Sequence, residues 1–559
     1  MIRMECVGRS FPSGARAVRD ISLTVERGSI LGLIGSNGSG KSSCARILCA
    51  MDLADEGSAI VDGIDPAAGE PDRLAVREMV AYVQQDPVDQ LVSTIVFDEV
   101  AFGPRNLGLD EGEVERRVRG ALAAVDLAGS ADCDVAALSG GEQQRLGIAG
   151  ALAMNPRYLV LDEVTAMLDS AVRPSFRELI ASRAEAGTGV VLVTHDVSEM
   201  ALCDRLLALE GGQAIWRGDI ASLASSPDGL WDRCVVPTGY SEALRAALRA
   251  GVPREACVRP ESLARAVLGI SGGLEAIFQG GGLCEDALPL NTSAAPQSGR
   301  GPSPDDGIAF ARASYSYAGA DDDARLAVSD ASLSVPRGEV VLLAGRSGSG
   351  KSTMASLACG LLTPDAGSVA LFGRAPEPAS CGVSFQRPEN QLFLDSVFDE
   401  LAFALRNQGG AERDIERRVR TTAARLGIDE ELFDRSPFEL SGGQARRVGL
   451  GCVLSLDAPA YVFDEPTAGL DARGRVLVHR LMRGLAEEGR AVLVISHDLE
   501  EWMGAVDSVA LMRDGSICWQ GDARRLSTAP AIFREAGIEP PEGALLREAL
   551  AYEGGVHVG

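Results

Sequence analysis

The sequence predicts an α/β protein made of two tandem copies of one domain, each with a mostly parallel sheet covered by helices. Two glycine-rich segments indicate the duplication, GSNGSGKS at 35–42 and GRSGSGKS at 345–352, because each follows an apolar strand and precedes a helical pattern. Later landmarks keep a constant offset of 302 residues: Ser139 and Ser441, Asp162 and Asp464, and His195 and His497. A repeat of this length is a whole domain, far longer than the unit of a solenoid.

The elements of each copy follow in the same order. Alternating apolar residues open the copy, an apolar strand such as ILGLIG at 30–35 leads into the glycine-rich loop, and a helix follows. Two further apolar strands end in YLVLDE at 158–163 and VVLVTHD at 190–196 of the first copy. Their counterparts end in YVFDE at 461–465 and AVLVISHD at 491–498. Buried strands separated by helical stretches are typical of a parallel sheet.

The copies differ in length at one place and are separated by a linker. The first copy has 44 residues from Lys41 to Gln85, whereas the second has 35 from Lys351 to Gln386, a nine-residue insertion in the first. The stretch 241–267 predicts two short amphipathic helices joined at Gly-Val-Pro. We expect a first copy at 1–225, a helical extension at 226–267, a flexible Gly/Ser/Pro-rich linker at 268–306, a second copy at 307–526 and a short tail at 527–559.

Composition and charge argue against several classes of protein. With 46% apolar residues the 559-residue chain can bury packed cores, yet no apolar run approaches the ~20 residues that a membrane span needs. The initial MIRMECVGRSF lacks an apolar block of signal-peptide length, so we expect a cytosolic protein unless a partner brings it to a surface. Twelve cysteines without a CxxC pair favour packed thiols over disulfides or zinc. A net charge of −26 argues against nucleic acid as the main partner.

The two glycine-rich loops contain the only lysines of the chain, Lys41 and Lys351, while the other 51 basic residues are arginine. A compact ammonium fits among phosphate oxygens where a flat guanidinium does not. Glycine lets backbone amides converge on a β-phosphate, the following helix adds its positive end, and Ser42 or Ser352 offers a hydroxyl to Mg²⁺. One GxxxxGK[ST] match can be a chance surface turn, but two matches that use both lysines predict two nucleoside triphosphate sites.

An acidic pair ends the next buried strand that both copies share, Asp162-Glu163 and Asp464-Glu465. The first carboxylate can hold Mg²⁺ through water, and the second can polarise the water that attacks the γ-phosphate. Alone, such a pair is usually the start of a solvated loop. Its recurrence after both glycine-rich loops favours a catalytic role.

Two of the four histidines, His195 and His497, lie 32 residues after Glu163 and Glu465 respectively. A lone histidine at a strand end is ordinarily structural, whereas two at equivalent places predict a contact with the γ-phosphate. An imidazole there can donate to the phosphate and orient the water.

A further repeated segment, LSGGEQQR at 138–145 and LSGGQARR at 440–447, precedes an amphipathic helix. Locally, Ser139 and Ser441 are predicted N-caps of that helix. A cap alone does not explain why the segment recurs 23 residues before the aspartate of each acidic pair. Together these motifs resemble the ATP-binding cassette (ABC) ATPases, whose signature is LSGGQ, over almost all of both copies.

The resemblance implies two ATP-binding cassettes, each a P-loop NTPase domain with a parallel-sheet core, an antiparallel β subdomain and a helical signature subdomain. It also implies that the cassettes pair head to tail around two ATP molecules. The signature of one cassette then closes over the ATP on the lysine of the other: Ser441, Gly442 and Gly443 over Lys41, and Ser139, Gly140 and Gly141 over Lys351. The residues implied to be catalytic are Glu163, His195, Glu465 and His497.

Three further pairs of residues are assigned by the resemblance. Phe11 and Tyr317 match the aromatic residue that stacks on adenine, although Phe11 could also be a core aromatic. Gln85 and Gln386 match the glutamine that links Mg²⁺ to the membrane subunit. Asp169 and Asp471 match an aspartate that crosses the dimer interface.

The resemblance therefore implies many residues in each copy that contact ATP or Mg²⁺. The residues implied to contact ATP are Phe11, Gly35, Ser36, Asn37, Gly38, Ser39, Gly40, Lys41, Ser42, Ser43, Gln85, Ser139, Gly140, Gly141, Tyr317, Gly345, Arg346, Ser347, Gly348, Ser349, Gly350, Lys351, Ser352, Thr353, Gln386, Ser441, Gly442 and Gly443. Those implied to hold Mg²⁺ are Ser42, Gln85, Asp162, Ser352, Gln386 and Asp464.

Neither copy departs from the family at the catalytic glutamate, the histidine or the signature serine, so both sites are predicted to hydrolyse ATP. Two local departures occur. Val164 stands where the family usually has proline, as at Pro466, and Glu142 stands where it has the signature glutamine. Neither change removes a phosphate ligand, so we expect little effect on the chemistry.

The segments at 85–106 and 386–407 indicate one type of ABC ATPase, because both share a Q-x-P-x-x-Q core followed by V-F-D-E-x-A-F. They are similar to the ATPases of energy-coupling-factor (ECF) transporters, which import vitamins and transition-metal ions. DEVTAMLD at 162–169 resembles the first ATPase of such pairs and DEPTAGLD at 464–471 the second, as if both were fused. The predicted helices at 241–267 resemble the C-terminal dimerisation region of these ATPases.

The resemblance implies membrane partners, namely a transmembrane coupling protein and a small substrate-capturing membrane protein. It therefore implies a peripheral location at the cytoplasmic face of the cell membrane. Coupling proteins of that family present arginine-bearing helices, and Asp86, Asp89 and Glu389 beside the glutamines can form charge-assisted pairs with them. Acidic residues on a solvated loop are the alternative interpretation.

Two other functions stay open on the sequence. The ATPase of another ABC importer or exporter differs only in its partner. A twin-cassette ATPase acting on ribosomes or DNA would need a charged helical linker or zinc-binding CxxC pairs, which the Gly/Ser/Pro linker, the lack of CxxC and the net charge of −26 disfavour. The transported substrate is not encoded, because the capture protein selects it in this family.

Overall fold

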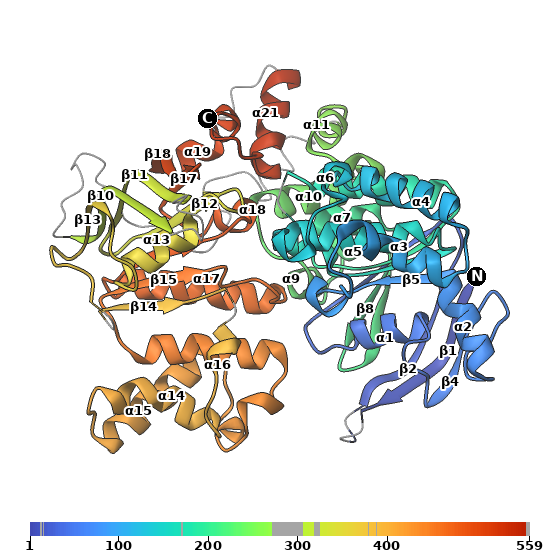
Figure 1. Cartoon of the computed structure of the whole chain (residues 1–559), viewed down its shortest axis with the longest axis horizontal. Coiled ribbons are helices and arrows are strands. Elements are labelled where there is room, and N and C mark those ends of the chain that lie inside the picture. The colour runs from blue at the N-terminus through green and yellow to red at the C-terminus, as the bar shows by residue number, and fades with distance from the viewer. Residues whose placement is uncertain are drawn as a thin grey trace. The chain divides into compact units, whose positions relative to one another are not determined.

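The computed structural model describes residues 1–11, 14, 16–168, 171–270, 306–317, 325–377, 380–386 and 388–554. The chain forms two compact units, coloured blue to green and yellow to red in Figure 1. The first unit contains Met1–Val236 and Ala243–Ile277, and the second contains Pro237–Glu242 and Phe278–Gly559. The short segment Pro237–Glu242 therefore belongs with the second unit although it lies in the first half of the chain.

The core of the first unit is a six-stranded sheet in the order β5-β6-β7-β3-β8-β9. Its strands are β3 (Ile30–Gly35), β5 (Val80–Val83), β6 (Tyr158–Asp162), β7 (Gly189–Val193), β8 (Arg205–Glu210) and β9 (Gln213–Gly218). The first five strands of that order run parallel, and β9 pairs antiparallel with β8. Every residue of β3, β6 and β7 is buried, as the apolar runs predict for a sheet covered on both faces.

A separate antiparallel sheet in the first unit has the order β2-β1-β4, with β1 (Ile2–Ser10), β2 (Arg16–Val25) and β4 (Glu56–Val61). Helices α3, α4 and α5 pack on one another as a helical subdomain. The helices of the first half are α1 (Lys41–Leu48), α2 (Glu70–Met79), α3 (Val96–Asn106), α4 (Glu111–Ala124), α5 (Gly140–Ala153), α6 (Arg173–Glu185), α7 (Val197–Leu202), α8 (Ile220–Ala224), α9 (Leu230–Cys234), α10 (Gly239–Arg249) and α11 (Pro260–Leu268). Short 3₁₀ segments are η1 (Pro87–Asp89), η2 (Ala128–Ser130), η3 (Val135–Ala137), η4 (Val164–Met167) and η5 (Arg254–Val258).

The second unit repeats this plan. Its main sheet has the order β14-β15-β16-β12-β17-β18 and its antiparallel sheet the order β11-β10-β13. The strands are β10 (Gly307–Tyr317), β11 (Arg325–Pro336), β12 (Val340–Gly345), β13 (Ala366–Leu371), β14 (Cys381–Ser384), β15 (Ala460–Asp464), β16 (Ala491–Ile495), β17 (Ser508–Arg513) and β18 (Ser516–Asp522). The helices are α13 (Lys351–Ala358), α14 (Val397–Asn407), α15 (Glu412–Leu426), α16 (Gly442–Ser455), α17 (Ala472–Glu487), α18 (Leu499–Trp502), α19 (Ala523–Ser527), α20 (Pro530–Glu535) and α21 (Glu542–Gly554). The 3₁₀ segments are η6 (Pro388–Gln391), η7 (Glu430–Leu432) and η8 (Pro437–Glu439).

The predicted fold class is confirmed, because each unit has a parallel-sheet core, an antiparallel sheet and a helical subdomain. The nine additional residues of the first copy fall where α2 lies, between β4 and β5. Helices α10 and α11 occupy the stretch in which the sequence predicts two short helices, and the tail contains α20 and α21. Most of the predicted linker, 271–305, lies outside the described residues.

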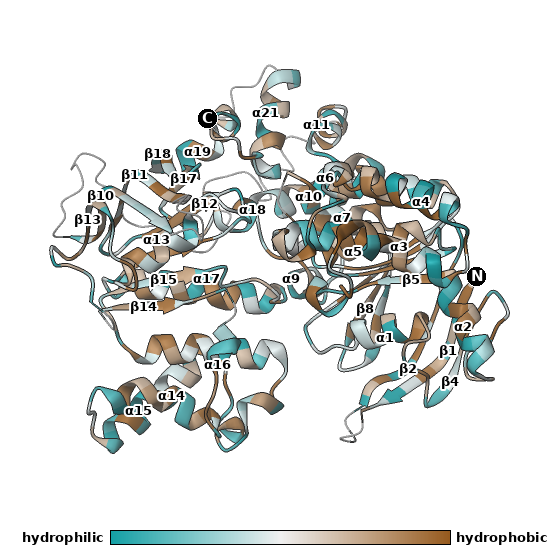
Figure 2. Ribbon diagram, in the orientation of Figure 1, coloured by the Kyte–Doolittle hydropathy of each residue, from teal (hydrophilic) through white to brown (hydrophobic). Residues whose placement is uncertain are grey.

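Hydropathy follows the same plan in both units. In Figure 2, the matching helices α4 and α15 both carry many hydrophilic residues. The main sheet, α14, α15 and α16 of the second unit contribute to a single buried cluster. Among the described residues, no helix combines the length and apolar character required to cross a membrane.

Candidate functional site

The two glycine-rich loops share left-handed glycines at matching places after β3 and β12. Gly38 and Gly40 have φ of 73° and 99°, values that residues with a Cβ rarely adopt. A Cβ on Gly40 would lie 2.5 Å from the carbonyl oxygen of Ala17. At the matching Gly350, φ is 105° and the Cβ would lie 2.3 Å from the oxygen of Ala327. Each loop thus leads directly into the N-terminus of α1 or α13, where free N–H groups favour an anion.

Both lysines lie at these helix N-termini and fold back over their own loops. The Nζ of Lys41 donates to the carbonyl oxygens of Gly35 at 2.8 Å and Ser36 at 3.1 Å. The Nζ of Lys351 donates to those of Gly345 and Arg346, both at 2.8 Å. Each ammonium is therefore held at the mouth of the loop, which is the place that the sequence predicts for the β- and γ-phosphates of ATP.

The aspartate of each acidic pair is buried at the end of its strand. The pKa of Asp162 is raised by burial and by the neighbouring charge of Glu163, against hydrogen bonds from Tyr82 and Ser42. The Tyr82 hydroxyl donates to Oδ2 of Asp162 at 2.9 Å, while Oδ1 is buried without a hydrogen-bond partner. A divalent cation would favour the ionised form and use that oxygen, so the site fits Mg²⁺.

The second unit presents the matching serine and aspartate, without a counterpart of Tyr82. The Ser352 hydroxyl donates to Oδ2 of Asp464 at 2.8 Å, and burial raises the pKa of this carboxyl too. A serine hydroxyl directly beside a buried carboxylate is the pairing that a phosphate-bound Mg²⁺ requires.

The glutamates that follow are held in an unusual backbone conformation. Glu163 has φ of 50° and Glu465 has φ of 49°, in the left-handed region. Their backbone N–H groups donate to the carbonyl oxygens of Val193 at 3.0 Å and Ile495 at 2.8 Å, which are the last residues of β7 and β16. Such conformations cost about 1–3 kcal/mol and concentrate at functional sites. The sheet thus orients each glutamate towards the loop after the adjacent strand.

In the first unit, Glu163 is surrounded by the residues that the sequence predicts to share a site. Gln85 donates through Nε2 to Oε2 of Glu163 at 2.8 Å. The other carboxylate oxygen, Oε1, lies 3.2 Å from Nε2 of His195 and 3.6 Å from Nζ of Lys41. The structure therefore brings the four side chains of Lys41, Gln85, Glu163 and His195 together.

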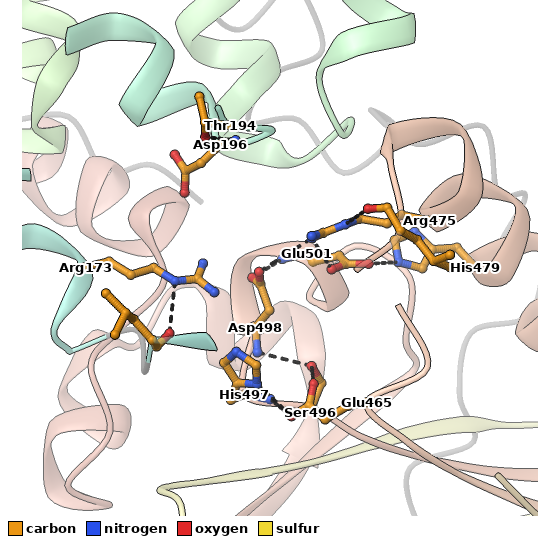
Figure 3. A network of polar contacts seen from close by, with 12 residues as sticks. Arg173, Thr194, Asp196, Glu465, Arg475, His479, Ser496, His497, Asp498 and Glu501 are labelled. Atoms are coloured by element: carbon orange, nitrogen blue, oxygen red, sulfur yellow. Dashed lines mark hydrogen bonds and ion pairs between the residues drawn. The ribbon is translucent and has the colours of Figure 1, made fainter. Parts of the chain in front are cut away.

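The second unit holds its glutamate by a different set of contacts, which Figure 3 shows. The backbone N–H of His497 donates to Oε1 of Glu465 at 2.9 Å, and the Nδ1 atom of the same histidine lies 2.7 Å from this oxygen. The Ser496 hydroxyl donates to Oε2 at 3.0 Å. Burial alone would raise the pKa of Glu465, but these contacts lower it below its ordinary value. Gln85 and Gln386 are both exposed, but Gln85 bonds Glu163 through its side chain, whereas Gln386 accepts from Arg446 through its backbone oxygen.

The signature serines cap their helices as predicted. Ser139 is the N-cap of α5 and forms a capping box with Glu142, whose Oε2 accepts from the backbone N–H of Ser139 at 2.8 Å. Ser441 forms the same box with Gln444 at the start of α16. Glu142 thus satisfies the cap as well as glutamine does in the second unit. The hydrogen bonds from Ser139 also lower the pKa of Glu142, so its negative charge remains at the positive end of α5.

Both predicted adenine-stacking aromatics are exposed. Phe11 follows β1 and is 53% exposed, which argues against the core alternative. Tyr317 ends β10 and is 46% exposed, and its hydroxyl lies 3.3 Å from Oγ1 of Thr353. Of the predicted interface aspartates, Asp471 caps α17 by accepting from the N–H of Gly474 at 2.8 Å. Asp169 lies outside the described residues.

The sequence did not predict a role for one buried arginine near the second site. Arg446 on α16 donates to the backbone oxygens of Glu465, Pro466 and Gln386, the last at 3.1 Å. Its Nη1 also lies 3.9 Å from Oε2 of Glu389. Gln144 stands at the matching position of α5 and is equally buried. The only feature of the sequence that could have indicated this role is a polar residue at a buried position of the helix.

The comparisons with known proteins agree with this geometry. A family model described as ABC transporter matches residues 18–166 and 328–468. A Bifidobacterium longum protein, BL0043, whose name assigns it to the ABC transporter ATP-binding proteins, is 35% identical over 542 residues, which are 92% of this chain and 65% of that protein. The chain thus covers less than two thirds of the length of this relative.

Two relatives have more specific names. YkoD of Bacillus subtilis, whose name proposes HMP or thiamine import, is 27% identical over 578 residues, 99% of this chain and 97% of that protein. The energy-coupling factor transporter ATP-binding protein EcfA2 of Symbiobacterium thermophilum is 36% identical over 256 residues, 44% of this chain and 89% of that protein.

Proposed function

Because this chain belongs to the ABC transporter family and is one of its ATPases, we propose that it energises a membrane importer of the energy-coupling-factor type. The segments at 85–106 and 386–407 support this type, and so does the similarity to EcfA2. YkoD, a relative of similar length, is named for import of HMP or thiamine. Its similarity supports the import of a vitamin-like compound, one of the two substrate classes expected for this type of transporter, the other being transition-metal ions.

Two ATP sites form between the cassettes in the proposed mechanism. The amides at the N-terminus of each P-loop helix and the lysine bind the phosphates, as the geometry around Lys41 and Lys351 supports. Ser441 of the second cassette completes the site of Lys41, and Ser139 completes that of Lys351. Phe11 and Tyr317, exposed at the ends of their strands, stack on adenine.

Mg²⁺ bound in these sites would supply positive charge that stabilises the transferring phosphoryl group. Ser42 and Asp162 would hold it in the first cassette, and Ser352 and Asp464 in the second, with Gln85 and Gln386 as further ligands. The hydroxyl-carboxylate contact between Ser352 and Asp464 supports this assignment.

Glu465 carries the mechanistic proposal. Its pKa is lowered, so the carboxylate is ionised at neutral pH and can accept a proton from water. His497 and Ser496 hold that carboxylate in place, and an imidazole at this position can donate to the γ-phosphate. Glu163 and His195 have the same roles in the first cassette.

The test uses the double substitution Glu163→Gln and Glu465→Gln. Glutamine keeps the shape but cannot accept the proton, so ATP binding should persist while turnover falls by at least 100-fold. Turnover is measured as phosphate release, and binding by equilibrium dialysis with labelled ATP. Glu185→Gln, an exposed glutamate at the end of α6, is the matched control. Undiminished phosphate release from the double variant would contradict the proposal.

Two exposed apolar side chains within the segments 85–106 and 386–407 support a membrane partner. Val92 is 67% exposed in the first unit, and Phe393 is 59% exposed in the second, where its ring packs edge-on against Phe403. Asp86 and Asp89 lie on the same segment as Val92. Each of these two surfaces suits a partner helix with apolar and basic side chains, and we assign both to contacts with the transmembrane coupling protein.

This assignment implies a peripheral location at the cytoplasmic face of the cell membrane. A tagged chain should recover a membrane protein with several spans from detergent extracts of its own host. Recovery of ribosomes in place of a membrane protein would contradict the transport function and leave the ATPase assignment intact.

A further inference from the structure

A buried glutamate follows each of the two histidines by four residues and has no role in the function proposed above. Glu199 on α7 is 1% exposed, and Glu501 on α18 is 4% exposed. Carboxylates are almost never this buried unless they are paired. The contacts of these two residues therefore show what each cassette uses the buried carboxylate for.

Both oxygens of Glu501 are bound by side chains of α17. Arg475 donates through Nη1 to Oε2 at 2.8 Å, and Nε2 of His479 lies 2.9 Å from Oε1 (Figure 3). The ring of His479 also packs edge-on against Trp502, with the ring centroids 4.5 Å apart. A buried pair with satisfied partners fixes geometry, and removal of one partner is costly.

Arg475 also connects this cluster to the loop before α17. Its Nε donates to the carbonyl oxygen of Leu470 at 3.0 Å, immediately before the capping residue Asp471. One guanidinium thus joins the loop that ends at Asp471 to helix α18, which follows His497.

Hydrogen bonds continue from Glu501 to the catalytic carboxylate. The backbone N–H of Glu501 donates to Oδ1 of Asp498 at 3.2 Å, and the N–H of Asp498 donates to Oγ of Ser496, also at 3.2 Å. Since the Ser496 hydroxyl accepts that bond, its single proton is directed to Oε2 of Glu465. The buried cluster and the catalytic glutamate are therefore ends of one continuous chain of contacts.

The first cassette uses the equivalent hydroxyl differently. Thr194 occupies the place of Ser496, and its hydroxyl donates to Oε2 of the buried Glu199. The N–H of Asp196 donates to this hydroxyl at 2.9 Å, as Asp498 does in the second cassette. Arg177 stands where the second cassette has His479. The hydroxyl before the histidine thus has two possible acceptors, the buried glutamate and the catalytic one.

We propose that Glu501, held by Arg475 and His479, is a positioning residue that leaves the Ser496 hydroxyl available to Glu465. With both oxygens of Glu501 occupied, the hydroxyl bonds the catalytic carboxylate and fixes the loop that carries His497. The inference rests on the proposed role of Glu465 in hydrolysis.

The experiment measures ATP turnover of the full chain with Glu501→Gln, Ser496→Ala and the combination of both. The turnover that is lost in Glu465→Gln is taken as the contribution of the second cassette. Glu501→Gln should lower the kcat of this contribution about tenfold. The KM for ATP should stay within twofold, because the residue does not touch the nucleotide. Arg480→Gln, exposed one residue after His479 on α17, is the control.

The double variant separates positioning from mere support of the fold. If Glu501 acts through Ser496, the combined variant should be no slower than Ser496→Ala alone, whereas independent effects would multiply. Turnover should also be higher in His479→Arg, which carries the residue of the first cassette, than in His479→Leu. If Glu501→Gln does not fold, Arg475→Lys replaces it, with the same expected loss of kcat.

Multiplying effects, a raised KM with unchanged kcat, or full turnover in Glu501→Gln would each overturn the inference. These outcomes are distinct from failure of the proposed function. That failure would be full turnover in Glu163→Gln combined with Glu465→Gln.

Discussion

Replacing Glu500 by glutamine should make the stability of the second unit less dependent on pH. The carboxylate of Glu500 on α18 accepts from the backbone N–H of Tyr240 at 3.1 Å and from that of Gly543 at 2.8 Å. Burial nevertheless raises its pKa from 4.5 to about 7, with a further contribution from the like charge of Glu542. The native state therefore binds a proton at this residue more tightly than the unfolded chain does.

The sign and size of the effect follow from this difference. A raised native pKa stabilises the fold fully below pH 4.5, and this contribution is lost as the pH rises through 7. At about 1.4 kcal/mol per pKa unit, linkage gives a loss of roughly 2 kcal/mol between pH 5.5 and pH 8. Because the side chain is only partly buried by surface area, we expect about 1–2 kcal/mol.

The assay is urea unfolding of the wild type and of Glu500→Gln at several pH values from 5.5 to 8. Tryptophan fluorescence reports the transition, because the buried Trp502 lies two residues from the substitution. The free energy of unfolding of the variant relative to the wild type should rise by about 1–2 kcal/mol across this range. Glu431→Gln, exposed on η7, is the control. A difference that is constant with pH, or that falls, would refute the reasoning.

Three further outcomes are expected. Arg446→Gln, which gives the second cassette the residue of the first, should lower kcat several-fold in a phosphate-release assay, because the carbonyl oxygens of Glu465 and Gln386 lose a shared donor. Gly40→Ala should weaken ATP binding at least tenfold by dialysis, since its Cβ would lie 2.5 Å from a backbone oxygen and its φ is 99°. Phe393→Asp should abolish recovery of the membrane partner in pull-downs while ATP turnover persists, since its exposed ring lies outside the site.

The sequence was sufficient to predict the fold class because the signals were both strong and repeated. A parallel sheet buried on both faces needs continuous apolar strands, and β3, β6 and β7 are such strands with every residue buried. The loops were equally predictable, since a backbone with φ of 99° at Gly40 requires glycine. The grouping of Pro237–Glu242 with the second unit was not predictable, because it depends on contacts between residues far apart in the sequence, such as Tyr240 and Glu500.

The site was predictable in its membership but not in its contacts. Spacing placed Lys41, Gln85, Glu163 and His195 at adjacent ends of parallel strands, and the structure brings them together. Spacing could not show that Gln85 bonds the glutamate through its side chain, whereas Gln386 accepts from Arg446 through its backbone oxygen. Matched motifs indicate equivalent positions in two copies, whereas hydrogen bonds depend on neighbours that differ between the copies.

In both cassettes the glutamate is connected to the glutamine segment by a hydrogen-bonding side chain, but the contacts differ. In the first, Gln85 bonds the Glu163 carboxylate directly, so the segment proposed to meet the membrane partner touches the group proposed to be catalytic. In the second, the guanidinium of Arg446 joins the carbonyl oxygen of Gln386 to that of Glu465. Each glutamate proposed to be catalytic is thus connected through one hydrogen-bonding side chain to the segment proposed to contact the membrane partner. A membrane partner that moves either segment would act on a carboxylate in the first cassette and on the strained backbone of Glu465 in the second.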